Sequence, residues 1–343
     1  FTVLSGETVS PLDPAPTRSQ FVFVGWYDED NEEFFDFTTP ISGDIELKAS
    51  WIQLSMSLRL ADEISMPFYV KNMDPRVEYT VKYSFNGGEV QTVTYTEHQP
   101  GEQESIVVAR CNATQMKAPV SIEVLRDGES FWTLSDYSIR TYCDRQFANP
   151  NADLKLKTLC RSILEYGAKA QINFNVDVDD LANAGLDSIA LESIPETEYK
   201  FNYEDVGGAR AAVKSTSISL ALRYKTEINY YFVPADGVDL KIYVQGPSDS
   251  EYVEVPVGTT GSYTRTNHED GRVQLTIANI GPVDMDKVFK VKAVNAANES
   301  VYRYVEYAGT TFLYNKQGDT AEGELCKAFY GYIKAAKAYK GVA

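Results

Sequence analysis

The chain has 343 residues, which is enough for two or three domains, and 43% of them are hydrophobic. Its 49 acidic residues outnumber its 32 basic residues, which gives a net charge of -17 at pH 7. Such a surface repels phosphate backbones and anionic lipids, so we expect no nucleic acid partner. Because no run of about twenty apolar residues occurs, we also expect no membrane insertion in this segment.

The first fifty residues contain a series of strand and turn motifs. They are Gly6-Glu7-Thr8-Val9, Phe23-Val24-Gly25-Trp26-Tyr27, the segment 35–41 and the segment 44–51. This pattern resembles the Listeria–Bacteroides repeat, or internalin B-repeat, a small module of surface proteins mostly of Gram-positive bacteria. The resemblance implies a β-grasp-like fold for residues 1–52, with Trp26 and Trp51 in its core, and an extracellular or cell wall-associated location. That family has a further strand upstream, so we expect a fragment of a longer secreted protein.

Beyond Trp51 the chain repeats itself. The segment 55–60 returns as 217–222, and the segment 159–166 returns as 325–332. In each copy, short alternating segments are separated by turn signals such as Asn86-Gly87-Gly88, which predicts antiparallel strands. The expected strands are 79–85, 90–95, 120–124, 238–244, 253–257, 272–277 and 288–294. Their close spacing predicts one β-sandwich in each copy.

Each copy ends in apolar residues at helical spacing. The stripe Leu159, Ile163, Tyr166 and Ala170 is repeated as Leu325, Phe329, Tyr332 and Ala336. Asp319 and Glu322 resemble a capping box, which predicts that the second helix begins near Thr320.

The predicted fold is therefore mainly β (α+β), a β-grasp-like repeat followed by two β-sandwich modules that each end in an α-helix. The predicted domains are the repeat at 1–52, copy 1 at 53–175 and copy 2 at 215–343. Residues 176–214 form a connector, and a strand around 199–203 is a candidate addition to the second sandwich.

Two further motifs lie at the end of copy 1. They are the segment 137–144 and the segment 164–171 followed by Asp180-Leu181-Ala182-Asn183. Over residues 55–183 the chain resembles a module of secreted and surface proteins of gut Clostridia. The resemblance implies no catalytic residue, and copy 2 is a degenerate version of the pattern.

Cysteine and histidine supply little for chemistry. The chain has four cysteines and two histidines, namely Cys111, Cys143, Cys160, Cys326, His98 and His268. Because no CxxC spacing occurs, we expect neither a metal site nor a cofactor, and we interpret the cysteines as small buried hydrophobic residues. Both histidines lie in polar loop sequences, which is not typical of a base that activates a nucleophile.

Other catalytic and binding motifs are missing or incomplete. No phosphate-binding loop or dinucleotide-binding glycine pattern occurs. The segment 175–180 begins like an EF-hand loop but lacks the required Gly and final Glu, so we interpret it as a solvated helix exit. A carboxylate pair for glycoside hydrolysis stays open, because such pairs meet in space rather than in sequence.

The pair Phe131-Trp132 is the one candidate ligand-binding site. Adjacent residues on a strand point to opposite faces, so one ring can pack inward while the other is exposed. An exposed indole is a surface on which sugar rings stack. The alternative is that Trp132 packs under the edge of the sandwich.

These observations favour a non-catalytic segment of a bacterial cell-surface or secreted protein with a spacer or adhesion role. The alternative is a glycan-binding accessory module of an extracellular carbohydrate-degrading system, and a third hypothesis is an enzyme with an unrecognised site. Candidate partners are an extracellular glycan or a surface protein of the host or a bacterium. A row of exposed aromatic residues would favour glycan binding, and facing carboxylates in a cleft would favour an enzyme.

Overall fold

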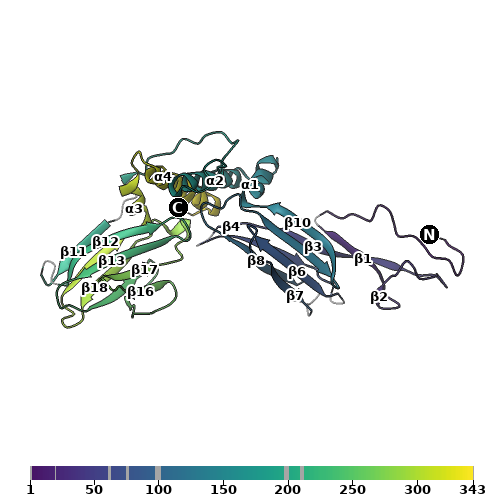
Figure 1. Cartoon of the computed structure of the whole chain (residues 1–343), viewed down its shortest axis with the longest axis horizontal. Coiled ribbons are helices and arrows are strands. Elements are labelled where there is room, and N and C mark those ends of the chain that lie inside the picture. Colours follow the sequence, from purple (N-terminus) through teal and green to yellow (C-terminus); the bar gives the residue numbers. More distant parts are fainter. Residues whose placement is uncertain are drawn as a thin grey trace. The chain divides into compact units, whose positions relative to one another are not determined.

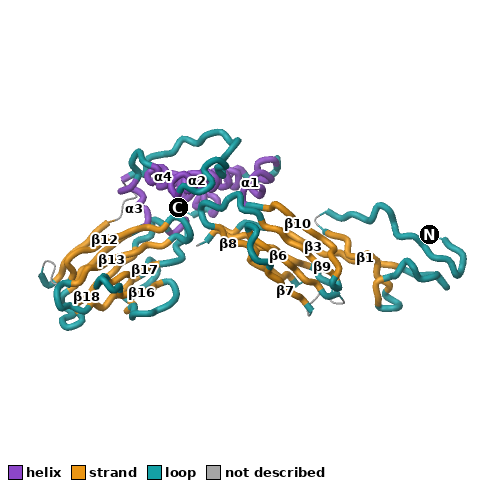
Figure 2. The backbone as a smooth tube through the Cα atoms, in the orientation of Figure 1, coloured by secondary structure: helices purple, strands orange, loops and turns teal. Residues whose placement is uncertain are grey.

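The fold is mainly β. The computed structural model describes residues 2–19, 21–60, 63–74, 77–96, 102–196, 201–208 and 212–342. Strands make up 37% and helices 20%, which confirms the predicted fold class (Figures 1 and 2).

The chain forms two compact units. The N-terminal unit contains 1–58, 65–110 and 118–137, and the C-terminal unit contains 59–64, 111–117 and 138–343.

The first sheet of the N-terminal unit runs in the order β2-β1-β3-β5, and β8 also pairs with β5. Its strands are β1 (Val22–Asp28), β2 (Glu33–Phe34), β3 (Leu47–Met56), β5 (Ile64–Lys71) and β8 (Gln103–Cys111). The strand β3 pairs with β1 through residues 47–52 and with β5 through residues 53–56. One continuous strand therefore belongs both to the segment predicted as the repeat and to the segment that follows it.

The second sheet of this unit has the order β10-β9-β6-β7. Its strands are β6 (Tyr79–Phe85), β7 (Gln91–Tyr95), β9 (Val120–Arg126) and β10 (Glu129–Tyr137). Two predicted turns join them, with positive φ at Asn86 and Gly87 and at Asp127 and Gly128. Both central residues of such a tight hairpin turn need positive φ, which Asn, Asp and Gly tolerate best, so the turn residues fix these hairpins.

The C-terminal unit contains two sheets with the orders β11-β19-β18-β14-β15 and β12-β13-β17-β16. The strands of these sheets are β11 (Phe201–Val206), β12 (Val213–Ala221), β13 (Glu227–Pro234), β14 (Leu240–Gln245), β15 (Val253–Glu254), β16 (Tyr263–Asn267), β17 (Val273–Ile277), β18 (Phe289–Asn295) and β19 (Tyr302–Tyr307). The short strand β4 (Arg59–Leu60) also belongs to this unit but to neither of its two sheets. The strand expected near 199–203 is present as β11, which pairs with β19. The strand expected at 253–257 is only two residues long. Pro256 has no amide hydrogen for the ladder, and a turn with positive φ at Gly258 follows it.

The helices are α1 (Ile139–Ala148), α2 (Leu154–Phe174), α3 (Gly309–Lys316) and α4 (Ala321–Lys340), and η2 (Pro282–Asp284) is a short 3-10 turn. The predicted helices are confirmed as α2 and α4. Thr320 caps α4 by accepting a hydrogen bond from the Gly323 amide, so the predicted start is confirmed, but the capping residue is Thr320 rather than Asp319. No helix in the described part of the chain is long and apolar enough to cross a membrane.

Within the C-terminal unit, α2 and α4 pack along each other (Figure 1). The ring of Tyr166 on α2 stacks on Tyr332 of α4, with centroids 5.8 Å apart, and lies 4.9 Å from the ring of Phe329. The Tyr166 hydroxyl donates a hydrogen bond of 2.6 Å to the carbonyl of Leu222, which follows β12. The two apolar stripes predicted from the sequence are therefore buried largely against each other.

A glycine permits a second close contact of α2. A Cβ at Gly167 would lie 2.4 Å from Cγ of Met116, closer than carbon atoms can approach, and 3.2 Å from Cβ of Ala182, which is a tight contact. Glycine in a helix interior costs about 1 kcal/mol relative to alanine. At this position the loss is offset by the packing of Met116 onto the helix.

We expect Tyr166→Phe to lower the free energy of unfolding by about 1–3 kcal/mol, because the Leu222 carbonyl loses its buried donor. Chemical denaturation measures the change. Tyr339→Phe is the matched control, since Tyr339 lies on α4 and is 46% exposed. Equal effects of the two variants would show that the buried hydrogen bond does not stabilise this unit.

Candidate functional site

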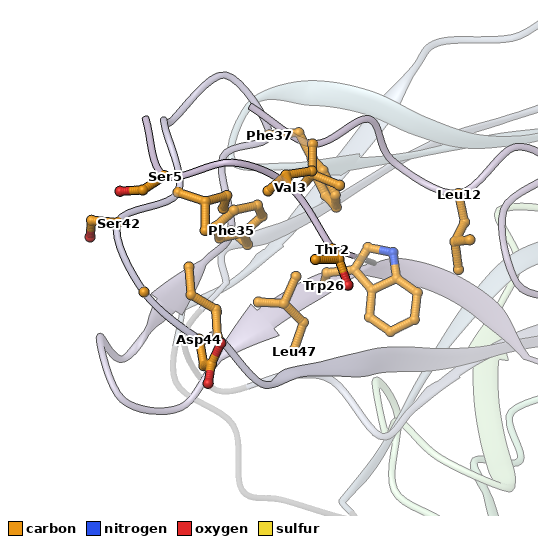
Figure 3. A pocket seen from close by; sticks show the side chains of 14 residues that line it. Thr2, Val3, Ser5, Leu12, Trp26, Phe35, Phe37, Ser42, Asp44 and Leu47 are labelled. Atoms are coloured by element: carbon orange, nitrogen blue, oxygen red, sulfur yellow. The ribbon is translucent and has the colours of Figure 1, made fainter. Parts of the chain in front are cut away.

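A cavity with a volume of about 590 Å³ lies in the segment predicted as the repeat (Figure 3). Trp26 comes from β1, Leu47 from β3, and Phe35 and Phe37 from the loop after β2. Figure 3 shows these side chains and Val3 around a common space, with Ser5, Ser42 and Asp44 toward one side. Its full lining is Thr2, Val3, Ser5, Val9, Leu12, Trp26, Phe35, Phe37, Ile41, Ser42, Gly43, Asp44, Ile45 and Leu47.

Aromatic packing builds one wall of this cavity. Phe23 contacts Trp26 and Trp51 edge to face, at centroid distances of 5.5 and 5.4 Å. Both tryptophans were expected in the core, but both are half-buried, and Trp26 faces the cavity. Asp44 is the single ionisable residue among the described lining residues. The cavity can therefore hold an apolar group but offers no acid–base pair.

The structure places Trp132 against the core of the N-terminal unit. Trp132 on β10 lies opposite Val124 of β9, whose side chain is fully buried. Its ring stacks on Phe68 of β5, with centroids 5.8 Å apart and an interplanar angle of 18°. A register shift between Ser130 and Trp132 leaves Phe131 as an extra residue, so simple strand alternation does not hold here. Phe131 and Trp132 are both half-buried.

The motif at the end of copy 1 makes a compact polar cluster within the C-terminal unit. Glu165 is buried and accepts a hydrogen bond of 2.6 Å from the Asn183 carboxamide. The buried carboxamide of Gln171 donates hydrogen bonds to the carbonyls of Asp177 and Asp180. It also accepts a hydrogen bond of 2.7 Å from the Ala182 amide. These side chains close the loop after α2, so the motif residues have structural roles.

The same loop is the segment that begins like an EF-hand. The side chains of Asp177, Asp179 and Asp180 are exposed, and Asp180 pairs with Lys117. In the part of the chain that the structure describes, no group of three His, Cys, Asp or Glu residues could hold a metal ion.

The remaining candidates for chemistry are the histidines and cysteines. Nε2 of His268 lies 2.8 Å from Oε1 of Gln274, and His98 lies outside the described residues. All four cysteines are buried. The thiol of Cys143 on α1 lies within hydrogen-bonding distance of the thiol of Cys160 on α2, and this contact is the main cause that raises the pKa of Cys143.

Comparison with known families identifies the N-terminal segment. Residues 2–50 match the Listeria-Bacteroides repeat domain, which supports the resemblance drawn from Phe23–Tyr27 and the flanking motifs. This repeat is typical of bacterial surface proteins and is generally a non-enzymatic module. A search of curated proteins found no significant match. The two sandwich modules, their boundaries and the likeness to modules of gut Clostridia stay predictions.

We expect Trp132→Ala to lower the free energy of unfolding by about 2 kcal/mol, because removing a half-buried indole leaves a cavity over Phe68. Trp132→Phe keeps an aromatic ring at the same place and should retain most of the stability. Thermal melting of both variants measures the difference. An unchanged melt for Trp132→Ala would instead favour an exposed ring available to a ligand.

We expect the native protein to resist a bulky maleimide at neutral pH, while all four cysteines react once the chain is unfolded. The thiolate is the reactive form, and burial raises the pKa of Cys111 and of Cys326 to about 12. Both thiols therefore stay protonated well above neutral pH. Mass spectrometry counts the labels, and rapid native labelling of any cysteine would contradict its burial.

Proposed function

We propose that the chain is a non-catalytic segment of a bacterial cell-surface or secreted protein, located outside the cell or at the cell wall, with a spacer or adhesion role. The repeat domain at residues 2–50 supports the location. The cavity within that repeat has apolar walls and a single carboxylate, which suits packing or adhesion rather than acid–base chemistry.

The observation that carries the spacer role is that the residues of the α2 motif (164–171) make buried structural contacts. Tyr166, Gly167 and Gln171 all face packed partners, and Glu165 is buried beneath Asn183. In an enzyme, the polar residues of the most distinctive motif would be expected to converge on a cleft. Here the same residues fasten α2 to α4 and to the loops beside it.

The acidic surface suits this role. An excess of 17 negative charges keeps a long extracellular protein soluble and disfavours collapse onto anionic polymers. An acidic spacer can therefore hold an adhesive part of the protein in solvent without binding to anionic polymers.

A second candidate function is a glycan-binding accessory module of an extracellular carbohydrate-degrading system. The observation that favours it is a row of outward-facing tyrosines on the five-stranded sheet of the C-terminal unit, with Tyr304 and Tyr243 in line. Phe131 and Trp132 stay the residues proposed for a glycan contact in the N-terminal unit, through the part of each ring that is exposed.

The location is tested on intact cells of the source organism with antibodies against the purified chain. We expect the protein in the wall or culture fraction and digested by protease added outside intact cells, while a cytoplasmic marker survives. Protection of the chain until the cells are lysed would overturn the proposed location. Release of new reducing ends from polysaccharides by the purified protein would overturn its non-catalytic role.

A further inference from the structure

The outer face of the five-stranded sheet in the C-terminal unit is rich in tyrosine. Along β14, Leu240, Ile242 and Val244 are buried, while Lys241, Tyr243 and Gln245 alternate with them on the other face. The same alternation on β18 and β19 places further polar and aromatic residues on that outer face, namely Lys290, Lys292, Tyr302, Tyr304 and Glu306.

The strand register brings three of these positions into one row with Glu254. Tyr304 lies opposite Lys292, Lys292 lies opposite Tyr243, and Tyr243 lies opposite Glu254 of β15. Neighbouring strands are separated by about 4.8 Å, so Tyr304 and Tyr243 are about 10 Å apart across the sheet. This spacing is close to the length of two linked pyranose rings.

Contacts between neighbours hold the rings of this face in place. The Lys292 ammonium lies 4.0 Å from the ring centroid of Tyr252 and 5.3 Å from that of Tyr302. The Tyr304 hydroxyl donates to Glu306, and the Tyr243 hydroxyl lies 3.4 Å from Oε2 of Glu254. A surface with fixed side chains loses less conformational entropy when it binds.

The charges on this face are close to balance, unlike those of the whole chain. Its lysines are Lys241, Lys290 and Lys292, and its glutamates are Glu204, Glu254, Glu299 and Glu306. Lysine and glutamate also alternate along it, as in the ion pair of 2.6 Å between Lys241 and Glu299. A neutral polymer meets both donors and acceptors here, whereas a polyanion meets repulsion from the glutamates and from the acidic remainder of the chain.

A similar sheet in the N-terminal unit has no tyrosine in the corresponding row. There Thr133, Glu123, Lys82 and Thr92 lie opposite one another across β10, β9, β6 and β7. In the same strand order, Thr133 occupies the place of Tyr304 and Lys82 occupies the place of Tyr243. An outer sheet face of this kind is therefore stable without tyrosines, and the requirements of the fold do not explain the aromatic row.

We propose that this face binds a neutral polysaccharide chain that lies along the row from Tyr304 to Tyr243. The C–H faces of pyranose rings pack on the tyrosine rings, and the sugar hydroxyls hydrogen-bond to the tyrosine hydroxyls, Lys292, Glu254 and Gln245. A flat face of this kind accepts the side of a long polymer rather than its end. This role rests on the glycan-binding function proposed above, to which it adds the binding face and the class of polymer, and it depends neither on the spacer function nor on where the protein is located.

Native affinity electrophoresis tests the proposal with the full chain. The gels contain mixed-linkage β-glucan, xyloglucan or galactomannan, and a polygalacturonate gel serves as the polyanion control. We expect at least one neutral polymer to retard the wild type, and Tyr243→Ala and Tyr304→Ala each to weaken that retention about tenfold, which corresponds to about 1.4 kcal/mol. Tyr224→Ala is the matched control, because Tyr224 is 67% exposed and lies outside the row.

Thermal melts of every variant separate binding from folding. If Tyr304→Ala fails to fold, Tyr243→Ala and Tyr304→Phe decide the outcome, since Tyr243 is half-buried on the outer face and phenylalanine keeps the ring of residue 304. No retention by any neutral polymer, retention by polygalacturonate alone, or retention that survives in folded Tyr243→Ala would each overturn the proposal. A polymer that is retained but shortened would support binding while contradicting the non-catalytic function.

Discussion

The packing of Tyr166 on α4 is the interaction on which the C-terminal unit depends. Its ring fills the space between α2 and the aromatic residues Phe329 and Tyr332, and its hydroxyl reaches the Leu222 carbonyl. A buried tyrosine needs both a large apolar contact and a hydrogen-bond acceptor, so few positions of α2 satisfy it. Once the helix is fixed in this way, Gly167 must face Met116 and Gln171 must face the loop that ends at Ala182.

The elements that the sequence predicted well are those fixed by local chemistry. Asn86-Gly87 and Asp127-Gly128 specify hairpin turns through positive φ, and the apolar stripe of α2 follows directly from residue spacing. The helices α1 and α3 were not predicted. The start of α3 at Gly309-Thr310-Thr311 has low helix propensity, so burial rather than local preference holds it. An apolar stripe also predicts which face of a helix is buried, but it does not predict that α4 packs on α2.

The candidate sites were harder to predict because they depend on strand register. Phe131 and Trp132 are adjacent, and simple alternation predicts opposite faces, but a bulge interrupts the alternation between them. The pattern Tyr302-x-Tyr304-x-Glu306 is visible in the sequence. What the sequence does not contain is the pairing of β18 with both β14 and β19, which brings Tyr304 into line with Tyr243.

The two roles proposed for the C-terminal unit use surfaces that do not compete. The motif residues of α2 are committed to buried contacts, so a change there costs stability. The outer face of a sheet contributes little to the core, and its residues can change while the strands keep their pairing. Thr133 and Lys82 of the N-terminal sheet stand where the C-terminal sheet has Tyr304 and Tyr243, which illustrates this freedom, since both rows lie on paired antiparallel strands. A spacer built in this way can gain a binding face without any change to the contacts that hold it together.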